Sequence, residues 1–465
     1  MKNSIKKILL LSLLISTINL SAQSFILPNY TTFKLPNGLT VSLMEQHDVP
    51  IISVSVILPA GAIYDNDKAG LASLTAIALK HGTENYPKAK LDEELDFIGA
   101  NIDTYATKEY FGLSSNFASK DKTKVLKIIK EVLLNPIFDT DEFEKEKSRL
   151  LVTLGQQKES PRSVIGAYFD TLLFGNHVYG NVKNGTKTTV SKLTVNDIKD
   201  FYKTNYKSNE AVICLVGDFS SKEIKATITK LFSSWDKSKI KTENLASKSI
   251  SSPKESSVLL VNKEDAKETT FYIGSPGVSR NNPDYVAIEV VNTLFGGRFT
   301  SMLNDELRVN SGLTYGAGSR FNNLKNGGSF YISTFTAVKT TEAAIDKALD
   351  VLNKLHTKGI DKNSLSSAKN YVKGQFPPRY ETNEQLAGLL SQMFWYNFDK
   401  SFIENFEKNV DGLDLAKANQ IIENYFPKDK LQFVLIGKSE DIKKIAEKYG
   451  KVIEVEIKDD INKMF

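Results

Sequence analysis

The sequence predicts an α+β fold of two homologous sandwich domains, each with helices packed on a mostly antiparallel sheet. Landmarks of the first half recur in the second half at nearly the same offset. The offsets are 217, 219 and 220 positions for three pairs of residues: Pro59 and Pro276, Tyr206 and Tyr425, and Gly217 and Gly437. This self-similarity indicates a duplicated unit of about that size. Strand and helix patterns are mixed inside each half, which predicts the α+β class.

Strand signals open the first half. Asn37-Gly38 lies between two strand-like runs and predicts a hairpin with positive φ at both turn positions. An apolar strand over Ile51 to Leu58 then ends in Pro59-Ala60-Gly61. The other predicted elements are a helix from about Leu71, a helix over residues 141–157, and a helix over residues 197–202 that leads to a strand ending at Gly217.

The second half repeats this order. An apolar strand over Thr270 to Ser275 ends in Pro276-Gly277, and a polar loop follows it, as in the first half. The remaining predicted elements are a helix from about Pro283, a helix over residues 343–355, and a helix over residues 418–423 that leads to a strand ending at Gly437.

The first 22 residues have the order of a secretory signal peptide. A basic head of Lys2, Lys6 and Lys7 precedes an apolar run over residues 8–18, and Leu20-Ser21-Ala22 offers a small-residue cleavage site. The apolar run is too short to span a membrane comfortably. We therefore expect residues 1–22 to be removed and the mature protein to be exported, either periplasmic or secreted.

The mature chain divides into two domains and a linker. Residues 23–233 form the predicted N-terminal domain, and residues 258–465 form the C-terminal domain. Between them, residues 234–257 are rich in Lys and Ser and poor in apolar side chains. This composition predicts an exposed linker.

Composition excludes several classes of function. The 465 residues include 60 Lys and Arg against 55 Asp and Glu, and three of the lysines lie in the signal segment. The remaining excess is too small to indicate binding to nucleic acid or to an anionic membrane. Cys214 is the only cysteine, so no intrachain disulfide can form, and its apolar neighbours predict a buried strand.

The histidines predict no metal site. The chain has four of them: His47, His81, His177 and His356. No two are close enough to chelate a metal from one helix, and no H-x-x-E-H or H-E-x-x-H pair occurs. His81 follows a predicted helix end, where we expect a solvated cap.

Residues 70–83 resemble the signature helix of the insulinase-like (pitrilysin) zinc peptidases. Active members read roughly G-L-A-H-x-x-E-H-M-x-x-x-G-T there. Five positions match this frame without a gap: Gly70, Leu71, Ala72, Gly82 and Thr83. The resemblance covers nearly all of residues 30–457 and implies the family's clamshell, of which this chain would form half. Residues 174–180 resemble a small turn of the first domain, so His177 is expected to be structural.

The chemistry of the signature helix is absent. The resemblance places the two family histidines at Ser73 and Ile77, the catalytic glutamate at Ala76 and the third ligand at Thr153. Zinc needs deprotonated N, O or S ligands, and activation of water needs a general base, which these side chains do not supply. An accompanying acidic position is kept as Glu146. We therefore predict that this chain holds no metal.

The second half keeps a different part of the resemblance. Gly296-Gly297 begins a turn that resembles the family's glycine-rich turn, and Arg308 and Tyr315 follow at seven residues' spacing. In relatives that pair reaches across the closed chamber toward the zinc site. The resemblance implies that all four residues bind substrate. It also implies catalytic roles in trans, with Tyr315 donating to an oxyanion and Arg308 holding a carbonyl or carboxylate. The alternative is structural: Arg308 as a charge at a helix C-terminus and Tyr315 as a strand residue.

Some bacterial members of the family are heterodimers of a zinc-bearing subunit and a sister that lacks the zinc helix. The resemblance implies that this chain is the sister in an exported oligopeptidase, inactive alone, with zinc in the partner and peptides as substrates. A second reading is an inactive peptide-binding or scaffold protein, because core proteins of respiratory complexes also resemble the family. A third reading, an active peptidase with a displaced metal site, conflicts with the small number of histidines.

Overall fold

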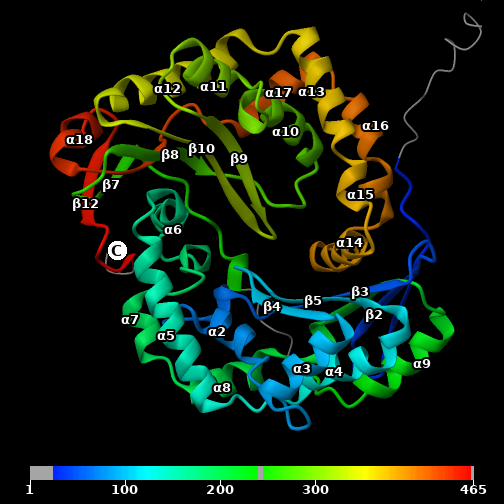
Figure 1. Cartoon of the computed structure of the whole chain (residues 1–465). Coiled ribbons are helices and arrows are strands. Elements are labelled where there is room, and N and C mark those ends of the chain that lie inside the picture. The colour runs from blue at the N-terminus through cyan, green and yellow to red at the C-terminus, as the bar shows by residue number, and fades with distance from the viewer. Residues whose placement is uncertain (1–24, 239–244, 462–465) are drawn as a thin grey trace, which may run out of the picture.

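The computed structural model describes residues 25–238 and 245–461 and contains two six-stranded sheets in them (Figure 1). The predicted signal peptide lies outside the described residues. In the part of the chain that is described, no helix is both long and apolar enough to cross a membrane.

The first sheet is built from residues 31–217 in the order β1-β2-β6-β3-β5-β4. Its strands are β1 (Thr31–Lys34), β2 (Thr40–Glu45), β6 (Val212–Gly217), β3 (Ile51–Leu58), β5 (Phe111–Ala118) and β4 (Asn101–Ala106). Only β2 and β6 are parallel; the other neighbours are antiparallel. Cys214 is fully buried in β6, as predicted.

The second sheet repeats this arrangement in the order β12-β7-β11-β8-β10-β9. Its strands are β12 (Lys451–Glu456), β7 (Ser257–Asn262), β11 (Gln432–Gly437), β8 (Glu268–Pro276), β10 (Gly327–Ala337) and β9 (Ala317–Leu324). Strand β7 is parallel to both of its neighbours, and the remaining pairs are antiparallel. The last five strands therefore match the last five of the first sheet in order and direction. The prediction of two homologous α+β domains is confirmed.

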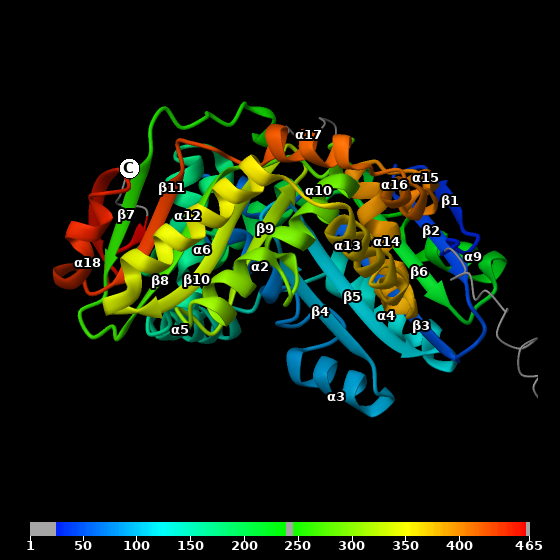
Figure 2. The same cartoon turned by 90° about the horizontal axis from the view of Figure 1, so that it is seen from above.

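Helices cover the outer face of each sheet (Figure 1). Those of the first half are α2 (Leu71–Ala78), α3 (Lys88–Ile98), α4 (Lys122–Leu134), α5 (Thr140–Gln157), α8 (Val195–Asn205) and α9 (Ser221–Phe232). Those of the second half are α10 (Tyr285–Asn292), α12 (Thr341–Lys358), α13 (Lys362–Gly374), α17 (Leu415–Tyr425) and α18 (Ser439–Ala446). Figure 2 shows α3 projecting from the side of the molecule next to β4.

The inner face of each sheet is covered by a helix of the opposite half. Helix α6 (Pro161–Phe174) packs on β8 and β11, and α14 (Asn383–Tyr396) packs on β3 and β6 (Figure 1). The hydroxyls of Ser55 on β3 and Ser391 on α14 lie 2.8 Å apart in this buried contact. Each half packs one helix on the sheet of the other half. The hydrophobic core on the inner face of each sheet therefore contains side chains from both halves.

One turn differs from its prediction. In the hairpin between β1 and β2 only Gly38 has a positive φ, of 90°, so the expectation for Asn37 is wrong. Pro36 fixes its own φ near −65°, which favours an ordinary turn followed by one left-handed glycine. The backbone bonds fit this, since Gly38 N donates to Leu35 O at 2.8 Å and Leu35 N to Leu39 O at 2.9 Å.

The segment predicted as an exposed linker is anchored at two points. Trp235 is 4% exposed, and its indole N–H donates to Tyr206 O at 3.1 Å. Ala246 is 1% exposed and lies in a core cluster with Phe174 and Tyr179. The average composition of the segment missed these single apolar side chains.

Candidate functional site

The side chains of α2 at the expected ligand positions are used for packing and for hydrogen bonds within the fold. Ser73 is buried, and its hydroxyl donates to Lys183 O at 2.9 Å and to Asn184 Oδ1 at 3.3 Å. Ala76 has no exposed surface, and Ile77 is partly exposed. None of these side chains has a free donor atom for a metal, so this helix does not fit zinc.

Helix α5, which packs against α2, adds no ligand. Thr153 is exposed, and Glu146 forms an ion pair with Arg149 at 3.2 Å. Within residues 25–238 and 245–461, no group of three His, Cys, Asp or Glu side chains is arranged to hold a metal.

Two of the histidines, His177 and His81, occupy structural positions. His177 accepts from Tyr179 N at 3.1 Å through Nδ1, while Nε2 lies 3.1 Å from Lys248 O, to which it can donate. His81 is only 5% exposed, so its prediction as a solvated cap is wrong. Burial lowers the pKa of His81. The chain turns back directly after α2, with His81 N bonded to Ala78 O at 3.0 Å, and this keeps the imidazole inside.

The frame of the signature helix survives for structural reasons. The Asp65 carboxyl accepts from Gly70 N at 2.9 Å and Ala72 N at 2.7 Å at the helix start. Gly70 has φ +97°, and a Cβ there would lie 2.9 Å from Asn184 O. Asp65 is 1% exposed, and burial raises its pKa to about 8 although the two N–H bonds lower it.

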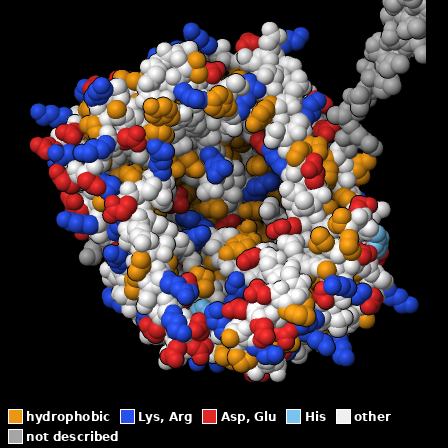
Figure 3. All heavy atoms as spheres, viewed as in Figure 1, with side chains coloured by type: hydrophobic (Ala, Val, Ile, Leu, Met, Phe, Trp, Pro, Cys, Tyr) orange, Lys and Arg blue, Asp and Glu red, His pale blue; other side chains and the backbone are white. Residues whose placement is uncertain are grey.

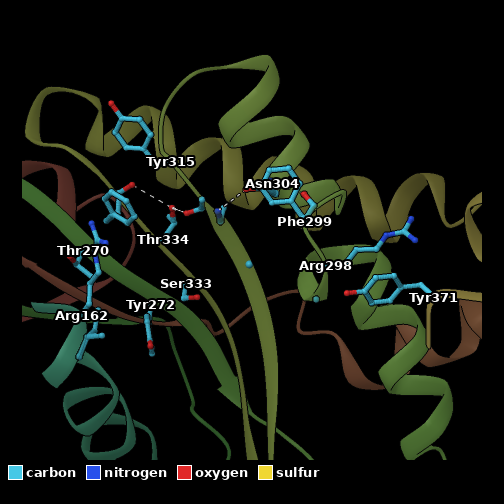
Figure 4. Close-up of a pocket in the computed structure, with 17 residues that line it drawn as sticks. Arg162, Thr270, Tyr272, Arg298, Phe299, Asn304, Tyr315, Ser333, Thr334 and Tyr371 are labelled. Carbon is cyan, nitrogen blue, oxygen red and sulfur yellow. Dashed lines mark hydrogen bonds between the residues drawn. The ribbon is translucent and has the colours of Figure 1, made fainter. Parts of the chain in front are cut away.

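A cavity of about 570 Å³ lies between the second sheet and α6 (Figure 4). Tyr315, Gly296 and Gly297 line it, so the structure brings together three of the four predicted substrate-binding residues. Arg308 does not line this cavity. Its guanidinium lies 4.6 Å from the centre of the Phe299 ring, and Phe299 does line the cavity.

Tyr315 stands at the rim of this cavity (Figure 4). Its side chain is 84% exposed, and its hydroxyl has no hydrogen bond to any described residue. The residue precedes β9 by two positions and therefore lies in a loop, not in the strand of the structural alternative. Its ring stacks near the ring of Phe335, with centroids 6.5 Å apart, and the guanidinium of Arg162 lies 3.4 Å from the same Phe335 ring.

The glycine-rich turn has two different glycines. It forms the wide helical turn η6 (Thr293–Gly297), and it packs against β9. Gly296 is buried, and a Cβ there would lie 2.4 Å from Ser319 N, so only glycine fits. Gly297 is exposed to the cavity. Gly296 thus shapes the wall, whereas Gly297 leaves the backbone accessible.

Sequence reasoning missed two polar residues of the cavity. Asn304 lies in α11 (Met302–Asn304); its amide donates to Phe299 O at 2.6 Å, and its oxygen accepts from Ala317 N at 3.3 Å. The Asn304 side chain therefore connects the loop at Phe299 with the loop that precedes β9. Arg162 comes from α6 of the first half, and only the helix exchange brings it here. No local pattern could have indicated it.

Family models match parts of both halves of the chain. The family model named Insulinase (Peptidase family M16) matches residues 40–182, and the model named Peptidase M16 inactive domain matches residues 192–372. A "Non-peptidase homolog YmxG" of Helicobacter pylori is 24% identical over 417 residues, which cover 86% of this chain and 94% of that protein. Cytochrome b-c1 complex subunit 1 of Rattus norvegicus is 27% identical over 267 residues, covering 56% of this chain and 54% of that protein.

Solved structures share the same fold. A peptidase M16 inactive domain from Pseudomonas fluorescens has a TM-score of 0.83 at 24% identity and covers 88% of this chain and 98% of its own. A protease from Helicobacter pylori has a TM-score of 0.80 at 20% identity, with 88% and 100% coverage.

Proposed function

Because this chain belongs to the insulinase family (peptidase family M16) and matches its non-peptidase and inactive-domain members, we propose that it is a subunit without a zinc centre of its own. It binds peptides in the cavity beside Tyr315 and completes the active site of a homologous, zinc-bearing subunit. The single observation that supports this most strongly is the contrast between the two halves. The signature helix is buried by its neighbours, whereas Tyr315, at the rim of an open cavity, has a hydroxyl that bonds to no described residue.

Residues that line the cavity suit a bound peptide, and so does Arg308, which lies against Phe299 of the cavity wall. The Tyr315 hydroxyl can donate to a carbonyl oxygen as negative charge develops on it. The Arg308 guanidinium can hold a carbonyl or a carboxylate in the fixed geometry of its N–H groups. The exposed backbone of Gly297 allows close approach of a peptide. The partner supplies the metal and the general base.

Export to the periplasm or the medium is part of this proposal. It rests on the signal-like order of residues 1–22, and it places the chain where an oligopeptidase meets short peptides.

Reconstitution tests the proposal. The mature chain is purified alone and together with a homologous subunit that has an intact H-x-x-E-H helix, and hydrolysis of a fluorogenic peptide is measured. We expect a stable complex by size-exclusion chromatography and hydrolysis only by the complex. Full activity of the zinc-bearing subunit alone, or no complex, would contradict the proposal.

A second candidate is a scaffold without a role in hydrolysis. The similarity to cytochrome b-c1 complex subunit 1 supports it, because that protein is named as part of a respiratory complex. A scaffold does not need the hydroxyl of Tyr315, so the Tyr315→Phe variant described in the Discussion separates the two candidates.

A further inference from the structure

A second cavity adjoins the one beside Tyr315. Its volume is about 650 Å³, and the two cavities share Gly297 and Tyr371 in their walls. It lies where α10 and α13 meet the edge strand β9. Gly297 and Tyr371 therefore form the boundary at which the two cavities meet.

Arginine is the prevailing charged residue of both walls. Arg162 and Arg298 line the first cavity, and no Asp or Glu among the described residues lines it. Arg320 and Arg379 line the second cavity, with Glu289 as its acidic residue. Lys and Arg side chains are also visible on the walls of the central hollow in Figure 3.

Two of these arginines are not neutralised by a carboxylate. Arg298 uses Nε and Nη1 for neutral partners, Thr300 O at 3.3 Å and Ser367 Oγ at 3.0 Å. Arg320 is exposed, and no carboxylate among the described residues lies within 4.0 Å of it or of Arg298.

The other two arginines are paired. Arg379 forms an ion pair with Glu289 at 2.6 Å, and this neutralises the acidic group that the described residues place in the walls. Arg162 pairs with Glu268 at 3.3 Å, and both side chains are about half exposed, at 56% and 49%. Exposed pairs of this kind are weak, so the Arg162 guanidinium remains available to a ligand.

We propose that the two neighbouring cavities select acidic peptides, whose Asp or Glu side chains bind Arg298 and Arg320. This inference rests on the proposed function, because it names the class of peptide that the same site binds. Guanidinium–carboxylate hydrogen bonds are about twice as strong as neutral ones. Hydroxyls beside the arginines, such as those of Ser333 and Tyr371, offer further donors.

Peptide binding by the mature chain alone tests this inference. Three short peptides of equal length carry Glu, Gln or Lys at the same positions and an uncharged dye, and fluorescence anisotropy gives their Kd values. We expect the Glu peptide to bind most tightly, and its Kd to rise with NaCl concentration because the contact is ionic. The Lys peptide should bind most weakly.

Variants locate the effect. Arg298→Gln and Arg320→Gln should each weaken binding of the Glu peptide by on the order of tenfold, the size of a lost charged hydrogen bond, and leave the Gln peptide nearly unchanged. Arg298→Lys should retain part of the preference. The matched control is Lys428→Gln, because Lys428 pairs with Glu423 beside α17 and lines neither cavity.

The outcomes distinguish this inference from the proposed function. Equal Kd values for the Glu and Gln peptides, or an unchanged Kd in both arginine variants, would overturn the preference and leave peptide binding intact. Failure of all three peptides to bind would overturn the peptide-binding function and the preference together. Thermal melting shows whether a variant is folded, and the salt dependence of the unmodified chain remains decisive if one variant is not.

Discussion

Two threonines hold the loop that carries Tyr315. Thr334 Oγ1 donates to Gly316 O at 2.8 Å, and Thr336 Oγ1 donates to Leu313 O at 2.6 Å, both from β10. The backbone is thus fixed on each side of Tyr315 while its side chain stays 84% exposed. The backbone thus holds Tyr315 at the rim of the cavity, while its exposed side chain can turn toward a substrate.

Tyr315→Phe should lower kcat of the reconstituted pair by about 10²–10³-fold, the usual cost of losing one oxyanion donor. The phenyl ring keeps the contact with Phe335, so the melting temperature should not change. Steady-state hydrolysis of a fluorogenic peptide measures the effect. Tyr86→Phe, which does not line the cavity, is the control. Normal kinetics for Tyr315→Phe would favour the scaffold.

Arg308→Ala should raise KM of the same pair more than it lowers kcat. The guanidinium then contributes to binding the substrate and the transition state alike, which is the signature of uniform binding. Initial rates over a range of peptide concentrations separate the two constants. A fall in kcat at constant KM would assign Arg308 to the transition state instead.

Asp65 should make the protein less stable as the pH rises from about 4 to about 8. Burial raises the pKa of the folded state to about 8, above the value of about 3.9 in an unfolded chain, so the folded state holds the proton more tightly. Its contribution is fully present below pH 4 and is lost as the pH passes 8. Urea unfolding across this range measures it. Asp65→Asn should flatten this part of the profile; an unaltered profile would mean that Asp65 is ionised in the folded protein.

At the scale of elements, the exchange of α6 and α14 determines which surfaces are buried. Phe169 of α6 is 1% exposed, and its ring lies 5.8 Å from the ring of Tyr272 on β8 and 5.8 Å from that of Tyr331 on β10. The helix of the first half therefore completes the core of the second half. It also carries Arg162 to the cavity.

Phe169→Ala should lower the free energy of unfolding by about 3–5 kcal/mol, as is usual for deletion of a buried aromatic ring. The loss should appear in one transition for the whole molecule, because α6 belongs to both halves. Phe97→Ala on α3 is the matched control, since Phe97 is 86% exposed. Guanidinium unfolding measures both. Two separate transitions in Phe169→Ala would contradict a shared core.

Local patterns predicted individual strands, but they did not indicate which distant elements pack together. The apolar run from Ile51 to Leu58 coincides with β3, because a buried strand is recognisable from its own residues. The prediction of a positive φ for Asn37 was wrong because the preceding residue, Pro36, restricts the backbone of the turn. The helix exchange could not be predicted, since the apolar faces of α6 and α14 do not specify which sheet they cover.

At the scale of the molecule, one buried carboxyl joins the halves. Glu109 of the first half is 2% exposed and accepts from the Tyr179 hydroxyl and from Lys325 N, the latter at 2.9 Å, at the tip of the β9–β10 hairpin. Trp395 Nε1 of α14 lies 3.5 Å from the same carboxyl. Burial raises the pKa of Glu109. Together with the exchanged helices, this contact fixes the β9–β10 hairpin, which forms part of the cavity wall, to the first half.

The candidate site could be predicted only in part. The family resemblance of one continuous segment indicated Tyr315, Gly296 and Gly297, and the structure places these three residues in the wall of one cavity. The sequence did not indicate Arg162 and Phe335, because the walls they form depend on packing between segments far apart in the chain. The prediction that this chain holds no zinc depends only on the residues at the four positions that the family resemblance indicates, and it remains to be tested.

Zinc content tests the central claim most directly. The purified mature chain is dialysed against metal-free buffer at neutral pH, and its bound zinc is measured by inductively coupled plasma mass spectrometry. Ser73 is bonded to Lys183 O, Ala76 is buried, and Thr153 offers a single hydroxyl, so we expect far less than one zinc per chain. A ratio near one zinc per chain, retained through dialysis, would contradict it.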